Sequence, residues 1–357
     1  MFDFNLAFYI DIKYYLINSL MRWDEKCMKS FTGYIGTYCS SNSYGIYRFT
    51  LDAERGRLSA PEPFLPVQDS KFLALREDGL LASVVKRRYG AGLFLARIRE
   101  IPCAQNETMT EDGSGCHVVL SGTHAYTANF HSGTVSCYRL TDTAPVLEHM
   151  ISIAPEAGCH QVLLHNELLL IPCMELDEIR LFSTEDYTSR GEIVFPSGSG
   201  PRHGIFDRTH RNLYVAAQKD NAVYRYSVHG DGFELMQRIP LLDAPGSGCD
   251  ETAAIRLSPD ERFLYVSVRG ANLIVVLACA SDGLRVIQRV SCGGDHPRDI
   301  ALSPDGRFVL SANRYSGDLT CFPRDAASGR IGEQCSKVSV PEGVCIVFDA
   351  QTKGEEE

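Results

Sequence analysis

A short unit recurs along the chain, and this repeat constrains the fold more than any other feature. Each copy begins with two polar or cysteine positions, continues with alternating apolar residues, and passes through a turn into a second strand-like run. The clear copies are CHVVLSGTHAYTANF from 116, CHQVLLHNELLLIPC from 159, PRHGIFDRTHRNLYVAA from 201, AAIRLSPDERFLYVSV from 253 and PRDIALSPDGRFVLSAN from 297. A degenerate copy, KFLALREDGLLASVV, starts at 71, and a truncated one, GVCIVF, starts at 343.

The copies align on the second position of the unit, where neighbouring copies are 43 to 51 residues apart. The aligned residues are Phe72, His117, His160, His203, Ala254, Asp299 and Cys345. Seven copies at this period are typical of four-stranded propeller blades. No stretch shows sustained helical periodicity. The sequence therefore predicts an all-β, seven-bladed β-propeller.

The last copy, residues 343–348, has only one strand. The missing second and third strands match TGYIGTY at 32–38 and GIYRFTLD at 45–52. We therefore expect the N-terminal strands to join the C-terminal blade and close the ring, which leaves no open sheet edge.

The rest of the chain divides around this ring. Residues 28–350 are expected to form one propeller domain, and residues 351–357 a disordered tail. Residues 1–27 are aromatic and apolar but carry acidic residues and lack a basic n-region, so they do not resemble a signal peptide. We expect them to be an extension before a natural start at Met28. An amphipathic helix on a membrane surface is the alternative.

Charge and cysteine content exclude several classes of partner. A net charge of -10 disfavours nucleic acid, because phosphate binding needs clustered Lys and Arg. An acidic protein can still hold a local basic pocket for a small anion. The 13 cysteines include no C-x-x-C pair, which indicates reduced thiols in a cytoplasmic protein without a metal site. We expect no cofactor, no membrane partner, and a monomer or weak homo-oligomer.

Equivalent positions in a propeller lie on one ring, because the blades are related by rotation. The starts of the inner strands carry Cys116 with His117, Cys159 with His160, Arg202 with His203, and Arg298 with Asp299, and His296 lies just before the last pair. The exits of the second strands carry Phe130, Met174, Gln218, Arg269 and Arg314. These two sets can meet at one mouth of the channel, where histidines and arginines suit water activation and anion binding.

Structural roles compete with this interpretation. An arginine at the mouth can instead form an ion pair with Glu251 or Asp299, and we expect Asp299 to orient Arg298 rather than act as a catalytic acid. Cysteine beside histidine can ligate a metal, but the spacing is not that of a zinc site.

The chain from about Phe31 to Phe348 resembles the seven-bladed lactonase family typified by bacterial 6-phosphogluconolactonase and fungal carboxymuconate-lactonising enzyme. The matching motifs are YIGTY, GIYRF, AYTANFHSGTVSCY, GCH at 158–160, GSGPRH at 198–203, LSPDERFLYVSVRG at 257–270 and HPRDIALSPDGRFVLSAN at 296–313. The resemblance implies three catalytic residues in this chain: His160, Arg202 and Arg269.

Two family carboxylates are missing. Where the family has Asn-Glu-Leu, this chain has Ala217, Gln218 and Lys219, and Ala254 replaces an acidic residue of the next inner strand. An amide can hydrogen-bond but cannot take a proton. Either His160 suffices as the base, or Glu251 substitutes, or the chemistry has changed.

The resemblance implies hydrolysis of an anionic sugar lactone, most like 6-phosphogluconolactone in the pentose phosphate pathway. His160 would activate water, and Arg202 and Arg269 would bind the oxyanion and the anionic group. The expected substrate-binding residues are Gln218, His203, His117, Arg298, His296 and Glu251. Two alternatives are a propeller that binds an anionic sugar or a protein without turnover, and a cycloisomerase acting on a muconate-like diacid.

Overall fold

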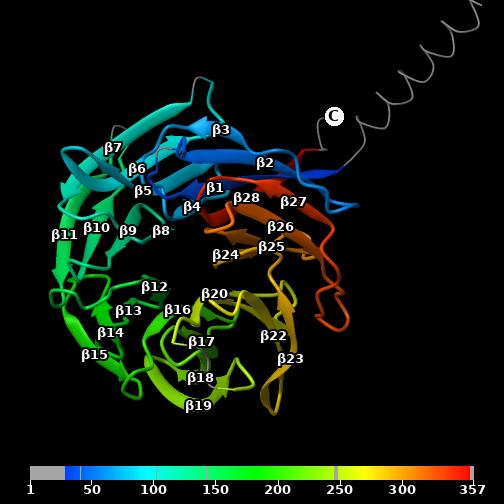
Figure 1. The fold of residues 1–357 in the computed structure, drawn as a ribbon. Helices are drawn as coiled ribbons and strands as arrows, with labels where there is room; N and C mark the ends of the chain where they lie inside the picture. Colours follow the sequence, from blue (N-terminus) through cyan, green and yellow to red (C-terminus); the bar gives the residue numbers. More distant parts are fainter. Residues whose placement is uncertain (1–28, 41, 102, 142–143, 245–247, 354–357) are drawn as a thin grey trace, which may run out of the picture.

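The computed structural model describes residues 29–40, 42–101, 103–141, 144–244 and 248–353, and these residues form seven four-stranded antiparallel sheets. The sheets are arranged round a common centre as propeller blades (Figure 1). This confirms the predicted all-β, seven-bladed propeller. The extension predicted over residues 1–27 lies outside the described residues. No helix in the described part of the chain is long and apolar enough to cross a membrane.

Six blades are each built from four consecutive strands, which run from the centre of the ring outward (Figure 1). The first three are β4 (Leu73–Leu75), β5 (Leu80–Arg87), β6 (Gly90–Arg97) and β7 (Ala104–Glu111); β8 (His117–Ser121), β9 (His124–Asn129), β10 (Thr134–Arg139) and β11 (Val146–Ser152); β12 (Leu163–His165), β13 (Leu168–Cys173), β14 (Glu178–Ser183) and β15 (Ser189–Val194). The next three are β16 (Pro201–Phe206), β17 (Asn212–Ala217), β18 (Ala222–His229) and β19 (Gly232–Pro240); β20 (Glu251–Leu257), β21 (Phe263–Arg269), β22 (Leu273–Ala280) and β23 (Gly283–Ser291); β24 (Pro297–Leu302), β25 (Phe308–Asn313), β26 (Asp318–Pro323) and β27 (Ser336–Ser339).

The seventh blade joins the two ends of the chain, as predicted. Its order is β28 (Gly343–Lys353), β1 (Ser30–Thr37), β2 (Ile46–Asp52) and β3 (Glu62–Leu65). Strand β1 pairs antiparallel with β28, with Tyr34 opposite Val347. After a bulge the pairing continues to Ser30 opposite Lys353. Strand β28 therefore extends past residue 351, where the tail was expected to begin.

The hydrophobic core is divided among the blade interfaces. Seven clusters of buried apolar side chains occur among the described residues, and each lies between two neighbouring blades. The cluster beside the closing blade, for example, joins Phe31 and Phe49 to Leu310 of β25. Apolar burial therefore stabilises the ring from blade to blade and leaves the axis to the innermost strands.

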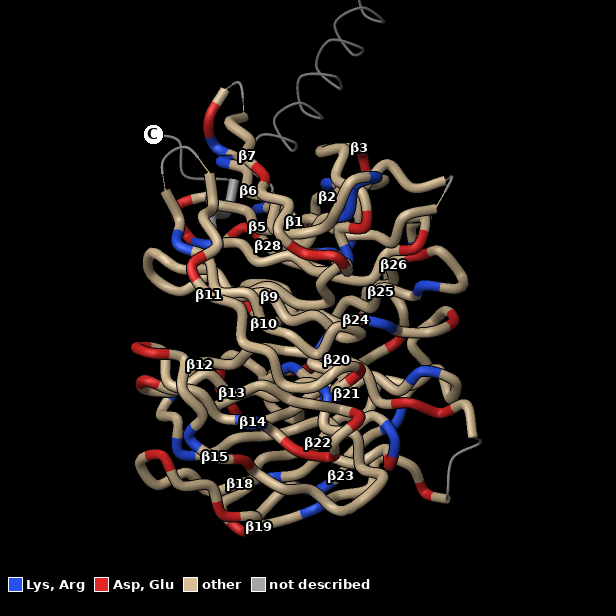
Figure 2. Tube along the Cα trace, turned by 90° about the vertical axis from the view of Figure 1, so that its left-hand side faces the viewer, with Lys and Arg blue, Asp and Glu red and all other residues tan. Residues whose placement is uncertain are grey.

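Charged residues of both signs are interspersed over the outer turns on the side seen in Figure 2. Basic segments do not merge there into an extended positive surface. The concentration of positive charge described below is instead inside the ring.

Asp299 ties three innermost strands together. Its carboxylate lies 2.6 Å from the Arg256 guanidinium of β20 and accepts a hydrogen bond of 2.9 Å from the backbone N–H of Ile346 in β28. The Asp299 side chain is 4% exposed, so bulk solvent has little access to these contacts. The expected pairing with Arg298 is therefore wrong: Asp299 belongs to the scaffold.

We predict that Asp299→Ala lowers the free energy of unfolding by about 3 kcal/mol, because it leaves the Arg256 guanidinium and a buried N–H without their partner. Urea denaturation at pH 7 measures the change. Asp282→Ala is the control, since Asp282 is exposed in the turn between β22 and β23. That variant should stay within about 0.5 kcal/mol of wild type. Equal stability of the two variants would contradict the scaffold role.

Candidate active site

Four aromatic rings from equivalent positions of four neighbouring blades meet at one end of the channel. The His117 ring lies 4.3 Å from Phe72 and 6.0 Å from His203, and His160 lies 5.0 Å from His203, all between ring centroids. His117 is the first residue of β8, and His203 lies in β16. Phe72 directly precedes β4, and His160 lies shortly before β12. The rotational relation between blades thus brings together residues far apart in sequence.

The histidines of this cluster are held neutral. Burial, aided by nearby arginines, lowers the pKa of His117 to about 3 and the pKa values of His160 and His203 well below their usual range. Desolvation disfavours a charged imidazolium, and the guanidinium groups repel it. At neutral pH these rings are therefore uncharged, and each can accept a hydrogen bond at one ring nitrogen and donate one from the other.

Arg202 is buried beside these rings without an opposite charge. It is 2% exposed, and its Nη1 donates to the carbonyl of Ala253 at 2.5 Å and to His203 Nδ1 at 3.3 Å. Burial and the charges of Arg298 and Arg269 lower its pKa well below the usual value. Such a group gains most from an anion brought next to it.

The contact with Arg202 also fixes where His203 carries its proton. A guanidinium can only donate, so His203 Nδ1 must accept and the ring proton must be on Nε2. That Nε2 is buried and has no hydrogen-bond partner. His203 therefore presents a neutral N–H donor.

A carboxylate lies at the next blade. Glu251 Oε2 is 3.0 Å from Arg269 Nη2, and Gln218 Nε2 donates to Glu251 Oε1 at 3.1 Å. The Arg269–Glu251 pair is close, but Nη2 is not aimed along a hydrogen bond. Burial and the charge of Arg298 lower the pKa of Arg269 to about 10 despite this partner. Glu251 thus holds both Gln218 and Arg269 at the mouth, while its side chain stays 41% exposed.

The outer mouth is basic and aromatic. The His296 ring lies 4.0 Å from the ring of Tyr315, and the Arg314 guanidinium lies 4.0 Å over the ring of Tyr38. Burial and four arginines lower the pKa of His296 to about 3. Arg298 has no carboxylate partner among the described residues, although its charge acts on Arg202, Arg269 and His296.

Most of the buried side-chain polar atoms that lack partners in the described structure belong to this mouth. They are His160 Nδ1, Arg202 Nε, His203 Nε2, Arg269 Nε and Nη2, His296 Nε2 and Arg314 Nε. All are nitrogens, and most must carry a proton. Buried donors are normally paired, because leaving one unpaired costs about 1–3 kcal/mol. Clustered unpaired donors of positive charge indicate a site for an anion.

A small cavity opens among these groups, and the Asp299 carboxylate of the scaffold also reaches its wall. The residues that line it are Tyr38, Lys71, Phe72, Cys116, His160, Arg202, His203, Arg298, Asp299 and Val344. Its volume of about 20 Å³ accommodates a water molecule rather than a sugar. A larger ligand would therefore bind in the mouth beside it and direct one small group into the cavity.

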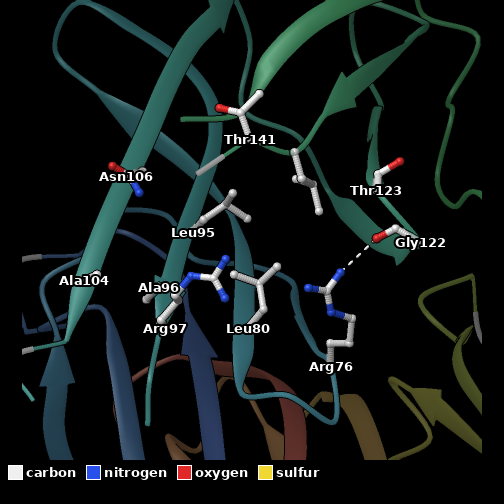
Figure 3. A pocket seen from close by; sticks show the side chains of 11 residues that line it. Arg76, Leu80, Leu95, Ala96, Arg97, Ala104, Asn106, Gly122, Thr123 and Thr141 are labelled. Carbon is white, nitrogen blue, oxygen red and sulfur yellow. Dashed lines mark hydrogen bonds between the residues drawn. The ribbon is translucent and has the colours of Figure 1, made fainter. Parts of the chain in front are cut away.

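A larger cavity of about 140 Å³ lies elsewhere, between the β4–β7 and β8–β11 blades (Figure 3). There Arg76 donates to the carbonyl of Gly122 and is also paired with Asp78, so its charge is satisfied. Leu80 and Leu95 form the apolar wall. It has neither the histidines nor the unpaired donors of the mouth, so we assign chemistry to the mouth.

Among the described residues, no three His, Cys, Asp or Glu side chains are close enough together to hold a metal ion. Proton transfer and hydrogen bonding are what the mouth residues themselves offer.

The structure places the sequence-predicted residues unequally. His160, Arg202, His203 and Arg298 line the small cavity, while Arg269, Gln218, Glu251 and His296 lie around it. His117 is not in the cavity wall: its Nδ1 accepts from the backbone N–H of Val162, and its ring packs on Phe72.

Tyr38 lines the cavity and was missed. It directly follows β1, which is the second strand of the closing blade, so it occupies the position of Gln218 and Arg314 in other blades. Aligning the second strand of the closing blade with the second strands of the other blades would have predicted Tyr38.

The chain is similar to known proteins over most of its length. It is 27% identical to 6-phosphogluconolactonase of Bacillus subtilis over 354 residues, which cover 90% of this chain and 99% of the relative. A solved structure of a protein from Lactobacillus plantarum has 28% identity and a TM-score of 0.83, and it covers 89% of this chain and 99% of its own.

A second solved structure, the periplasmic gluconolactonase of Pseudomonas aeruginosa, has 25% identity and a TM-score of 0.82, with the same coverage. The family model described as lactonase, seven-bladed beta-propeller, matches residues 32–348. This match spans the whole ring, including the closing blade. The chain therefore belongs to the seven-bladed β-propeller lactonase family.

Proposed function

We propose that this chain hydrolyses a sugar lactone that carries an anionic group, with 6-phospho-D-glucono-1,5-lactone as the first candidate. The observation that carries the proposal is the set of buried, unpaired nitrogen donors round Arg202 at the channel mouth. Family membership and the 6-phosphogluconolactonase relative support it. This substrate would place the reaction in the cytoplasmic pentose phosphate pathway.

In the proposed reaction His160 is the general base. Water attacks the lactone carbonyl carbon while the unpartnered Nδ1 of His160 takes one of its protons. The carbonyl oxygen becomes an oxyanion. When the tetrahedral intermediate collapses, the bond to the ring oxygen breaks, and that oxygen takes the proton back from His160 to give the hydroxy acid.

Arg202 and His203 face the developing negative charge. Arg202 Nε and His203 Nε2 belong to side chains that contact each other, and both atoms are buried donors without a partner. Donors fixed in advance in a water-poor site stabilise an oxyanion more than solvent does, since nothing needs to reorganise. Glu251 keeps Gln218 and Arg269 in place, so that they can orient the sugar.

The outer arginines would bind the anionic group of the substrate. Arg298 has no carboxylate partner among the described residues, whereas Arg314 forms a loose ion pair of 3.7 Å with Glu342. A phosphate dianion beside Arg298 would supply the negative charge that this side chain lacks, because arginine matches phosphate geometry.

Removal of the base tests the assignment directly. We expect His160→Gln to lower kcat for freshly prepared 6-phosphogluconolactone by about 10²–10⁴-fold. A continuous pH-drift assay, corrected for spontaneous hydrolysis, measures the rate. The control is His149→Gln, an exposed histidine on β11 that stacks on Tyr187. An unchanged rate in His160→Gln would rule out this base.

Removal of the central cation separates the candidate functions. We expect Arg202→Gln to lower kcat/KM by about 10²–10³-fold, since one preorganised donor is lost. Arg285→Gln, on the exposed side of β23, is the control. Turnover of carboxymuconolactone instead of the sugar lactone would favour the muconate reaction. Tight binding of 6-phosphogluconate without any turnover would favour a binding protein.

The pH dependence of kcat/KM should reflect the effect of burial and of the nearby arginines on the pKa of His160. Because the pKa of His160 is held well below its usual range, the neutral base persists below pH 6, and kcat/KM should not show a fall near pH 6.5 from this residue. Arg202→Gln removes a repelling charge, so the pKa of His160 rises and the acid limb moves to higher pH. The substrate phosphate titrates identically for both proteins, so the difference reports the enzyme. Superimposable profiles would contradict the proposed coupling.

A further inference from the structure

Two cysteines face each other at the edge of the β24–β27 blade. Cys321 lies in β26 and is buried, whereas Cys335 directly precedes β27 and is exposed. The backbone N–H of Cys335 donates to the carbonyl of Cys321 at 2.9 Å, and the next residue, Ser336, is the register partner of Cys321. Two successive residues therefore oppose Cys321, which is the arrangement of a β-bulge.

This bulge belongs to the blade architecture. Register shifts also occur between the third and fourth strands of other blades, in the pairs β10–β11, β14–β15, β18–β19 and β22–β23. The extra residue of a bulge at this edge lies next to the residue that it faces on the neighbouring strand. In the β24–β27 blade both of these residues are cysteines, so the bulge places the exposed Cys335 next to the buried Cys321.

The environment of the two thiols makes them chemically unequal. Cys335 Sγ donates to the carbonyl oxygen of Cys321 at 3.3 Å, and the interaction between the two thiols lowers the pKa of Cys335 and raises that of Cys321. The more acidic of the two thiols is therefore the one on the exposed residue. Thiolates rather than thiols react with oxidants.

We propose that Cys335 and Cys321 form a reversible oxidation site for peroxides, in which the bulge supplies an accessible thiol together with its buried partner. Cys335 reduces a hydroperoxide: its sulfur gains one oxygen to become a sulfenic acid, and the peroxide leaves as water or an alcohol. The Cys321 sulfur then attacks that sulfenic sulfur. The S–O bond breaks, water leaves with the proton of Cys321, and a disulfide remains.

The cysteine pair lies at the seam, that is, the interface between the β24–β27 blade and the closing blade. Cys335 Sγ contacts the carbonyl of Gly56, in the turn between β2 and β3 of the closing blade, and a Cβ added to Gly56 would lie 2.7 Å from that sulfur. One side of the Cys335 side chain therefore contacts the closing blade, while the residue as a whole stays exposed. A disulfide from Cys335 to Cys321 would close a chain loop next to this seam and restrict the unfolded chain.

A second cysteine pair provides an internal control. Cys159 and Cys173 are also opposite each other across strands, but both are fully buried. They should stay reduced under the same conditions, because a peroxide cannot reach either sulfur in the folded ring.

The test uses the fully reduced chain, treated with stoichiometric hydrogen peroxide, alkylated and mapped by mass spectrometry. We expect a peptide linked between Cys321 and Cys335 that dithiothreitol reverses, with Cys159 and Cys173 alkylated as thiols. The oxidised chain should also unfold at higher urea concentration than the reduced chain.

Two variants separate the roles of the sulfurs. In Cys335→Ser, Cys321 should remain a thiol, and in Cys321→Ser, Cys335 should stop at the sulfenic acid, which dimedone traps. If Cys321→Ser does not fold, the peptide map of the wild type and the Cys335→Ser result decide. Persistence of both thiols while Cys39 or Cys249 oxidises would overturn the proposal. None of these readouts depends on lactone hydrolysis.

Discussion

The pairing of β1 with β28 is the constraint on which the rest of the structure depends. Each blade buries its two faces only against its two neighbours, so an open ring would expose the apolar faces of two blades. Closing the ring with strands from both ends of the chain removes this exposure. It also fixes the seven innermost strands at the same distance from the axis, so groups at equivalent positions must meet.

This geometry permits an arrangement of charge that would be unstable elsewhere. Arg202, Arg269 and Arg298 repel one another, and several buried nitrogens lack partners. The apolar contacts that hold the ring lie between blades, so the axis can remain electrostatically unsatisfied without opening the fold. These unpaired donors favour the binding of an anion, because an anion supplies the negative charge and the hydrogen-bond acceptors that the neighbouring side chains do not. The apolar contacts that stabilise the ring and the polar groups of the candidate site thus lie in different parts of the same blades.

The repeat predicted the blade number, the closing strands and several of the residues that meet at the mouth, because rotation is a property of the period itself, but it did not point to Tyr38. It could not predict which partners each side chain selects. Asp299 was expected beside Arg298, its neighbour in sequence, but pairs across strands with Arg256 and with the backbone of Ile346. The pairing depends on how far the Asp299 side chain reaches toward the neighbouring inner strands, and the spacing of residues in the sequence does not give these distances. The thiol pair was hidden for the same reason, since a bulge changes which residues oppose each other.

The walls of the small cavity include Tyr38 and Val344, which come from the N-terminal and C-terminal strands of the closing blade. The histidines and arginines between them are made earlier in synthesis than Val344. The cavity therefore cannot be complete until synthesis has passed Val344, so a shorter nascent chain carries the histidines and arginines without an assembled pocket. A fragment that stops before Val344 would lack the last wall of the cavity, whatever the cavity binds.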